Sequence, residues 1–184
     1  CISLLLWGVP RALNGQLARI VLPGDTLEIS EIYDEATFLY RQGLYSEAIN
    51  RAEQGLQLSM RRESVQDEIR IMELMGDIYT GSGNSANALP YYVRTSHLLE
   101  SRKDTTGILR TYRKIARLYN REEVYGKELE YREKILNLRP GVPEGEEIMM
   151  KEQLGLAAYR SGKYDNAIPV FREILEIHGR AGAD

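Results

Sequence analysis

The sequence predicts an all-α fold made of four consecutive helical hairpins, and two observations lead to this prediction. A pattern of small, glycine and aromatic residues recurs about every 40 residues between residues 29 and 180. The apolar residues that follow each recurrence are spaced three or four positions apart, as on one face of a helix. A period of this length is typical of helical repeat arrays.

Small residues mark the middle of the first helix in each predicted hairpin. They recur at steps of 40, 40 and 39 residues, as Ala36, Gly76, Ala116 and Gly155. Seven positions after each of them stand Gly43, Gly83, Glu123 and Gly162. Glycine after a helix takes the left-handed conformation that ends it, so the first helices end there. Because repeat three has Glu123 at this position, we expect its turn to be looser.

A second set of small residues predicts the second helix of each hairpin. They lie twelve positions after the first set, as Ala48, Ala88 and Ala167, with Glu128 in repeat three. We expect the two small residues of a hairpin to face each other where its helices cross. A tyrosine that covers the turn is expected at Tyr45, Tyr125 and Tyr164. Pro90 and Pro169 fall near the start of their helices, where proline removes at most one backbone hydrogen bond.

The repeats assign residues 25–184 to one domain. Its repeats run over about 29–64, 65–104, 105–143 and 144–180, and each second helix is followed by a polar connector. Residues 179–184 match such a connector, so we expect the array to be cut before a further repeat. Ile174, Leu175 and Ile177 would then be left partly uncovered, because arrays normally end in a helix with a polar outer face.

This pattern resembles the tetratricopeptide repeat family over about residues 29–180. The resemblance rests on the small residue, the glycine at the helix end, the turn tyrosine, the second alanine and the following aromatic residue, together with Pro140 at the end of repeat three. Repeats two and four match best, although repeat two has Ser85 at the position of the turn tyrosine. It implies a right-handed α-solenoid with a concave groove lined by the first helices. The period near 40 exceeds the common 34, which implies longer helices or longer connectors.

Residues 1–24 differ from the rest of the chain. They contain no acidic residue, and residues 2–9 form an apolar run with the length of a signal-peptide core but too short to span a bilayer. We expect a truncated signal peptide and export to the periplasm or the cell surface of a bacterium. The alternative is an N-terminal hydrophobic helix that docks on the body of this protein, which would then be cytoplasmic. Contact with a membrane is expected only through this leader or through a missing C-terminal region.

No group of residues predicts catalysis, a cofactor or a metal in this chain. The single cysteine, Cys1, excludes a disulfide framework, and the two histidines, His97 and His178, stand far apart in the sequence. There is no glycine-rich phosphate loop and no nucleophile elbow. We therefore expect no enzyme activity in this part of the protein, and leave open what a full-length protein does. The net charge of −3 argues against nucleic acid as a partner.

Four arginines of repeat three form the candidate binding site. Arg110, Arg113, Arg117 and Arg121 recur at steps of three, four and four, and so lie on one helix face. The resemblance places them in the groove with Asn120 and with the equivalent positions Tyr33, Thr37, Arg70, Asp77 and Tyr159. The arginines either attract an acidic peptide or form a solvated face paired with Glu73, Asp77 and Glu152.

The function expected from these patterns is binding of a protein or peptide segment in the concave groove, in an exported protein. A second hypothesis makes the chain the sensory or regulatory region of a longer signalling enzyme, such as a membrane histidine kinase. A third makes it a cytosolic adaptor. The fold alone does not decide between them.

Overall fold

The computed structural model describes residues 23–138 and 143–181, and within these residues it contains eight α-helices and no strand. The predicted leader, residues 1–24, lies outside the described residues except for its last two, because the first helix begins at Pro23. The helices are α1 (Pro23–Arg41), α2 (Tyr45–Arg61), α3 (Val65–Gly81), α4 (Ser85–Ser101), α5 (Thr105–Arg121), α6 (Tyr125–Leu138), α7 (Glu144–Arg160) and α8 (Tyr164–Ala181).

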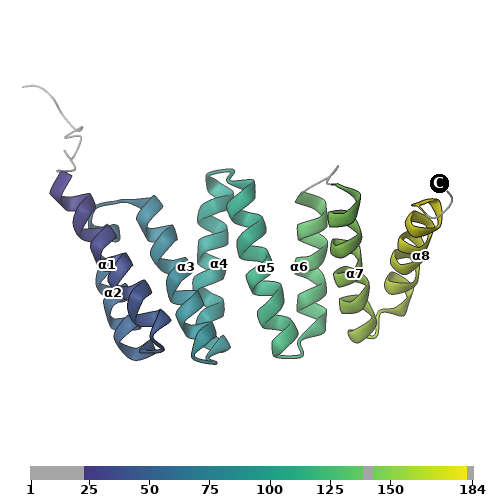
Figure 1. Cartoon of the computed structure of the whole chain (residues 1–184), viewed down its shortest axis with the longest axis horizontal. Helices are drawn as coiled ribbons and strands as arrows, with labels where there is room; N and C mark the ends of the chain where they lie inside the picture. The colour runs from purple at the N-terminus through teal and green to yellow at the C-terminus, as the bar shows by residue number, and fades with distance from the viewer. Residues whose placement is uncertain (1–22, 139–142, 182–184) are drawn as a thin grey trace, which may run out of the picture.

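The helices follow one another in a row, each packed against the next one along the chain (Figure 1). Consecutive helices run in opposite directions, so α1 and α2, α3 and α4, α5 and α6, and α7 and α8 are hairpins. The predicted all-α repeat fold is therefore confirmed. The core runs along the whole row, and Ile71, Met75, Ile78 and Ile115 are among its fully buried side chains.

The 40-residue period comes from long helices. Helices α2, α3, α4 and α5 have 17 residues each, and three residues separate each of them from the next helix. The connector between hairpins, such as residues 62–64, is thus as short as the turn inside a hairpin, such as residues 82–84. Of the two expected causes of the long period, lengthened helices is the correct one.

The turns share one backbone conformation, with a residue in the left-handed region. Gly43, Gly83 and Gly162 have φ values of 75°, 79° and 76°. Glu123 takes the same conformation with φ 59°, and the next amide, of Val124, donates to the carbonyl of Tyr119 at 2.9 Å. The equivalent bond after Gly83 is 2.8 Å long. The expectation of a looser turn in repeat three was wrong, because the closing hydrogen bonds involve only backbone atoms.

The small residues are buried, and at Gly76 and Gly155 an aromatic ring takes the place of the small partner that we expected. Ala36, Ala48, Ala88 and Ala116 are 0% exposed and Ala167 is 2% exposed. A Cβ atom at Gly76 would lie 2.5 Å from Cε1 of Tyr92, and one at Gly155 would lie 2.9 Å from the ring of Phe171. Each of these two glycines therefore admits an aromatic ring from the second helix, four residues beyond the alanine.

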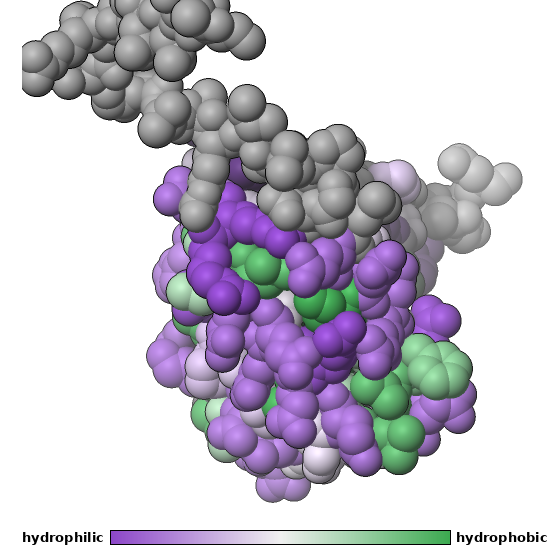
Figure 2. All heavy atoms as spheres, turned by 90° about the vertical axis from the view of Figure 1, so that its left-hand side faces the viewer, coloured by the Kyte–Doolittle hydropathy of each residue, from purple (hydrophilic) through white to green (hydrophobic). Residues whose placement is uncertain are grey.

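The two ends of the row differ in polarity. The α1 end is largely hydrophilic where it is described (Figure 2), and its exposed side chains include Glu28, Glu31, Asp34 and Glu35. On α8, Tyr164, Ile168 and Leu175 are 55%, 55% and 71% exposed. Of the three residues that we expected to be partly uncovered, Leu175 is exposed and Ile177 is partly buried, whereas Ile174 is buried.

No helix within residues 23–138 and 143–181 combines the length and the apolar character that a membrane span requires.

Candidate functional site

Three open hollows adjoin α5, and we call the surface onto which they open the groove face. The largest, of about 630 Å³, is lined by the outer side of α5. A second, of about 350 Å³, lies between α5, α6 and α7, and a third, of about 210 Å³, lies between α5 and the α3–α4 hairpin. Arg117 lines all three hollows.

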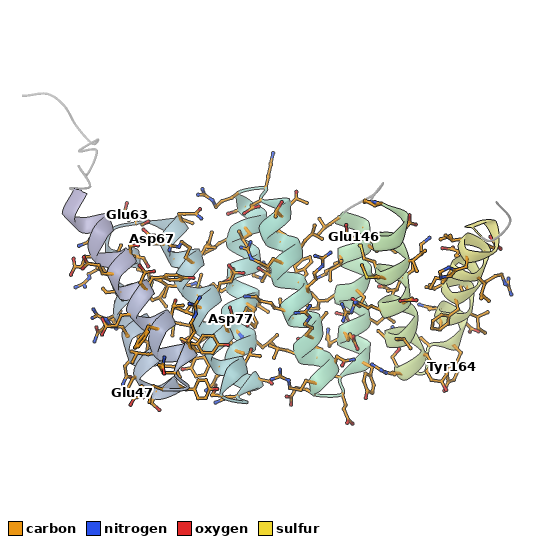
Figure 3. The ribbon with its side chains drawn as sticks, in the orientation of Figure 1. Glu47, Glu63, Asp67, Asp77, Glu146 and Tyr164 are labelled. Atoms are coloured by element: carbon orange, nitrogen blue, oxygen red, sulfur yellow. The ribbon has the colours of Figure 1, made fainter. Side chains whose placement is uncertain are left out.

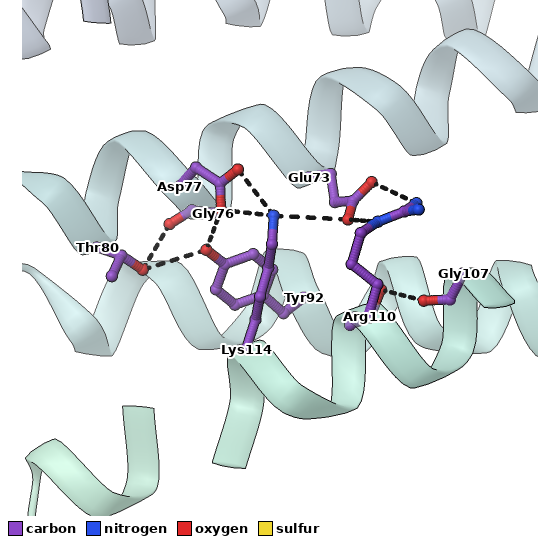
Figure 4. Close-up of polar contacts among 9 residues, drawn as sticks. Glu73, Gly76, Asp77, Thr80, Tyr92, Gly107, Arg110 and Lys114 are labelled. Carbon is purple, nitrogen blue, oxygen red and sulfur yellow. Dashed lines mark hydrogen bonds and ion pairs between the residues drawn. The ribbon is translucent and has the colours of Figure 1, made fainter. Parts of the chain in front are cut away.

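Three of the four candidate arginines of α5 contact groups on neighbouring hairpins. Arg110 holds Glu73 of α3 with two hydrogen bonds, of 2.7 and 3.0 Å (Figure 4). Arg113 pairs with Glu146 of α7 at 3.0 Å, and Arg121 donates to the carbonyl of Thr80 at 3.2 Å. Figure 3 shows Asp77 and Glu146, which face α5 from α3 and from α7, on opposite sides of that helix.

The ion pairs agree in part with the solvated-face hypothesis. Glu73 is a partner of Arg110, as that hypothesis requires. Asp77, however, pairs with Lys114 at 2.7 Å, and the partner of Arg113 is Glu146 instead of Glu152. These pairs join residues 33 to 37 positions apart, so the sequence pattern of a single helix does not reveal them.

Asp77 is the centre of a polar network beneath the third hollow. Besides Lys114 it accepts a hydrogen bond of 2.6 Å from the hydroxyl of Tyr92, which also lies 3.3 Å from Oγ1 of Thr80 (Figure 4). Burial of Tyr92, followed by its hydrogen bond to Asp77, raises the pKa of its hydroxyl well above its ordinary value. The network fixes the ring of Tyr92 over Gly76.

A buried ion pair underlies the second hollow. Glu128 is 3% exposed, and its carboxylate accepts hydrogen bonds from Arg132 at 3.2 and 3.3 Å and from Asn120 at 2.8 Å. Arg132 also donates to Gln153 of α7. Desolvation lowers the pKa of Arg132, Glu128 opposes this shift, and the charges of Arg117 and Arg113 add to it.

The remaining predicted groove residues do not meet at this site. The guanidinium of Arg70 lies 4.3 Å from the ring centre of Tyr33, between α3 and α1. Thr37 has a buried hydroxyl, and no hydrogen bond reaches it from the described residues. Tyr159 is 58% exposed and its ring contacts that of Tyr164 at 5.5 Å. The structure thus brings together Asp77, Asn120 and the α5 arginines, and leaves Tyr33, Thr37, Arg70 and Tyr159 apart from them.

Sequence reasoning missed Lys114, Arg132, Glu146, Met149 and Gln153, which also line the hollows. One signal was present for Arg132. It occupies the position at which repeats two and four have an aromatic residue, and it stands four residues after the equally unusual Glu128. A pair of opposite charges at that spacing on a helix is a recognisable ion pair.

The described residues contain no cluster of three histidine, cysteine or acidic side chains with a geometry that could hold a metal ion. The hollows are lined mainly by guanidinium, ammonium and apolar groups, with one carboxylate each in the second and the third, from Glu146 and Asp77. Such groups bind anions and apolar side chains through charge, hydrogen bonds and burial.

Comparisons with known proteins agree with this fold. Residues 150–178 match a family model described as a tetratricopeptide repeat. No curated protein matches the sequence. Among solved structures, BtubC (BKLC) from P. vanneervenii is similar with a TM-score of 0.69 and 15% identity, over 87% of this chain and 66% of that one.

Two further structures show the same likeness. A putative kinesin light chain with TPR-like repeats from Podosopora anserina gives a TM-score of 0.64 at 14% identity, over 83% of this chain and 76% of that one. The apo form of RapI gives a TM-score of 0.66 at 14% identity, over 90% of this chain and 61% of that one. This chain thus spans 66% of the length of BtubC and 61% of the length of RapI, less than two thirds of either.

These observations define the class of the protein: it is a helical repeat protein with a tetratricopeptide-type solenoid. The hairpin of α7 and α8 contains the matched tetratricopeptide repeat. A solenoid of this type is a protein–protein interaction module with an extended binding surface.

Proposed function

We propose that the groove face binds an extended segment of a partner protein, and that this segment carries acidic side chains. The observation that supports it most directly is the position of Arg117. Its side chain is exposed, it lines all three hollows, and no ion pair engages it within the described residues. An exposed guanidinium at such a junction is available for a bidentate bond to a carboxylate.

The charges around Arg117 support an acidic ligand. The largest hollow is lined by Arg110, Arg113, Lys114 and Arg117, and by no carboxylate. Glu73, which pairs with Arg110 and Lys114, is only 14% exposed, whereas Arg110 is 51% exposed. The cations therefore face the solvent while this carboxylate lies behind them, so the local field attracts anions although the net charge of the chain is −3.

Exposed apolar side chains on α7 support a peptide rather than a simple anion. Met149, Leu156 and Tyr159 are 56%, 43% and 58% exposed, and steps of seven and three residues place them on one face of the helix. Met149 lines the second hollow beside the arginines. Apolar and cationic groups on neighbouring helices match a segment that has apolar and acidic side chains.

Photocrosslinking tests this function. A p-benzoylphenylalanine placed at Leu156, on the same face of α7 as Met149, should capture the partner from the source cell. The same probe at Glu53, an exposed residue of α2 that lines none of the hollows, should not. Arg117→Glu should abolish capture at position 156. A partner that is captured only from position 53, or equally with Arg117→Glu, would contradict binding in the groove.

A second candidate function is that of a regulatory region in a longer signalling protein. It is favoured by Tyr164, Ile168 and Leu175, which are exposed on α8. The equivalent residues Tyr45, Ile49 and Leu56 of α2 are partly buried, and the following helix α3 packs on α2. The test is to lengthen the chain along its reading frame and to measure hydrogen exchange of the α8 amides. If a further helix packs on α8, this exchange should become slower. Unchanged exchange would count against this candidate.

A further inference from the structure

We propose that the hollow between α5, α6 and α7 is a subsite for one carboxylate and one apolar side chain, two residues apart in an extended peptide. This inference rests on the proposed function and names the chemistry of the bound segment. The hollow, of about 350 Å³, combines three guanidinium groups with apolar side chains from α6 and α7. We refer to it as the triple-arginine subsite, after Arg113, Arg117 and Arg132.

The charges of the subsite leave room for one carboxylate. Arg132 is paired with Glu128, and Arg113 with Glu146. Among the side chains that the structure describes, Arg117 has no ion-pair partner. Three positive groups are thus matched by two negative ones. A carboxylate from a ligand would complete the set and reduce the repulsion among the guanidiniums.

The apolar lining of the subsite selects the neighbour of that carboxylate. Ile135 and Met150, which are 3% and 7% exposed, form part of the wall, and Met149 beside them is 56% exposed. Covering these atoms with an apolar side chain would remove hydrocarbon from water. A free inorganic anion would gain nothing from them, so the ligand carries an apolar group as well as the charge.

The spacing in the peptide follows from the geometry of an extended chain. Successive side chains of such a chain point to opposite sides, and those two residues apart point to the same side, roughly 7 Å from each other. A single hollow can therefore take the side chains of residues i and i+2 at once. The expected ligand motif is an acidic residue and an apolar residue with one residue between them.

The sequence builds this subsite only in repeat three of the described chain. At the positions of Glu128 and Arg132, repeat two has Ala88 and Tyr92, and repeat four has Ala167 and Phe171. A buried ion pair is a poor source of stability in comparison with apolar side chains. In repeat three the ion pair places the guanidinium of Arg132 beneath Arg113 and Arg117. The aromatic ring that repeats two and four have at this position would carry no charge.

Fluorescence anisotropy with short labelled peptides tests the proposal. The probe is a fluorescein-labelled Gly-Glu-Ser-Leu-Gly peptide, compared with peptides in which Gln replaces Glu, Ser replaces Leu, or Glu and Leu are adjacent. We expect the Glu-Ser-Leu peptide to bind at millimolar concentration or below. Each altered peptide should bind at least threefold more weakly, and added salt should weaken the parent peptide.

Three protein variants complete the test. Arg117→Gln and the double variant Glu128→Ala with Arg132→Phe should each weaken binding about tenfold. The double variant copies repeat four, so it removes the guanidinium without leaving a buried charge. Arg172→Gln removes an exposed arginine of α8, away from the hollow, and should leave binding unchanged. Circular dichroism checks that each variant is folded.

Several outcomes would overturn the subsite. These are equal binding of the Gln and Glu peptides, unchanged binding by Arg117→Gln, and no binding of the Glu-Ser-Leu peptide at millimolar concentration. If a phosphoserine peptide bound and the Glu peptide did not, the charged group that the subsite binds would be a phosphate and not a carboxylate. If crosslinking at position 156 persists in any of these cases, the groove still binds a partner and only the subsite is wrong.

Discussion

The ring of Tyr92 covers Gly76 so closely that a Cβ atom at residue 76 would lie 2.5 Å from its Cε1 atom. Tyr92 is 1% exposed, and its hydroxyl is held by Asp77 at 2.6 Å. The ring therefore has no free path away from the glycine. This contact joins α3 to α4, and the same pair of positions in the last hairpin is Gly155 and Phe171.

Replacing Gly76 by alanine should destabilise the protein by about 1–3 kcal/mol, because the new methyl group would overlap the fixed ring. Gly126→Ala is the matched control. No atom outside its own helix segment lies within 4 Å of a Cβ built there, so alanine should stabilise by about 0.5–1 kcal/mol. Urea denaturation gives both values. A neutral Gly76→Ala would show that the ring can move aside.

Replacing Glu123 by glycine should stabilise the protein by about 0.5–1 kcal/mol. Glu123 has φ 59°, a conformation that costs about 1–2 kcal/mol for a residue with a side chain. Glycine avoids this cost, but it loses more backbone entropy on folding, which offsets part of the gain. Gly83→Ala, at the same place in repeat two with φ 79°, should have the opposite sign. Thermal melting of the two variants measures this, and a shift in the same direction for both would refute the argument.

The single variant Arg132→Met should cost about 3 kcal/mol, because it leaves the carboxylate of Glu128 buried without its main partner. The double variant Glu128→Ala with Arg132→Phe should be at least as stable as the original protein. It replaces the ion pair with the residues that repeat four has at these positions. Urea midpoints compare the three proteins. If the double variant lost as much stability as the single one, the pair would be a net source of stability.

Stability should fall above about pH 10, the ordinary pKa of tyrosine. Burial raises the pKa of Tyr92 and of Tyr112 in the folded protein, and hydrogen bonds to Asp77 and Glu100 add to the shift. The unfolded chain then loses protons that the folded chain keeps. The contribution of these groups is complete below about pH 10 and is lost as the pH rises towards their folded pKa values.

Tyr92→Phe should reduce this loss by up to about 1.4 kcal/mol per pH unit, since it removes one raised pKa and keeps the ring. Urea midpoints between pH 9 and 11.5 provide the measurement. Tyr159→Phe, which removes a hydroxyl from an exposed side chain, is the control. A slope that Tyr92→Phe leaves unchanged would place the alkaline transition elsewhere.

The sequence predicted the ends of α1, α3 and α7 well, because each of these ends carries a local signal. Gly43, Gly83 and Gly162 stop their helices through a conformation that depends on the residue itself. The contacts between helices were predicted less well. Gly76 suggested a small partner, but a glycine leaves space that an aromatic ring can also fill.

The acidic partners of the groove arginines could not be predicted from the sequence of one helix, for a different reason. Arg113 and Lys114 are adjacent in sequence, yet their partners Glu146 and Asp77 lie on opposite sides of α5. Which acid faces which cation depends on the offset between neighbouring helices. That offset is a property of packing and is not visible in the spacing of one helix.

The three-residue turns have a consequence for how the chain folds. Because the connector is equally short within and between the hairpins of residues 23–138, each pair of neighbouring helices there closes a loop of the same small size, at nearly the same entropic cost. No neighbouring pair within residues 23–138 is favoured as a starting point by the length of its connector. Folding can therefore begin at any of these joints and spread in both directions, and the residues that fill each joint decide where it begins first.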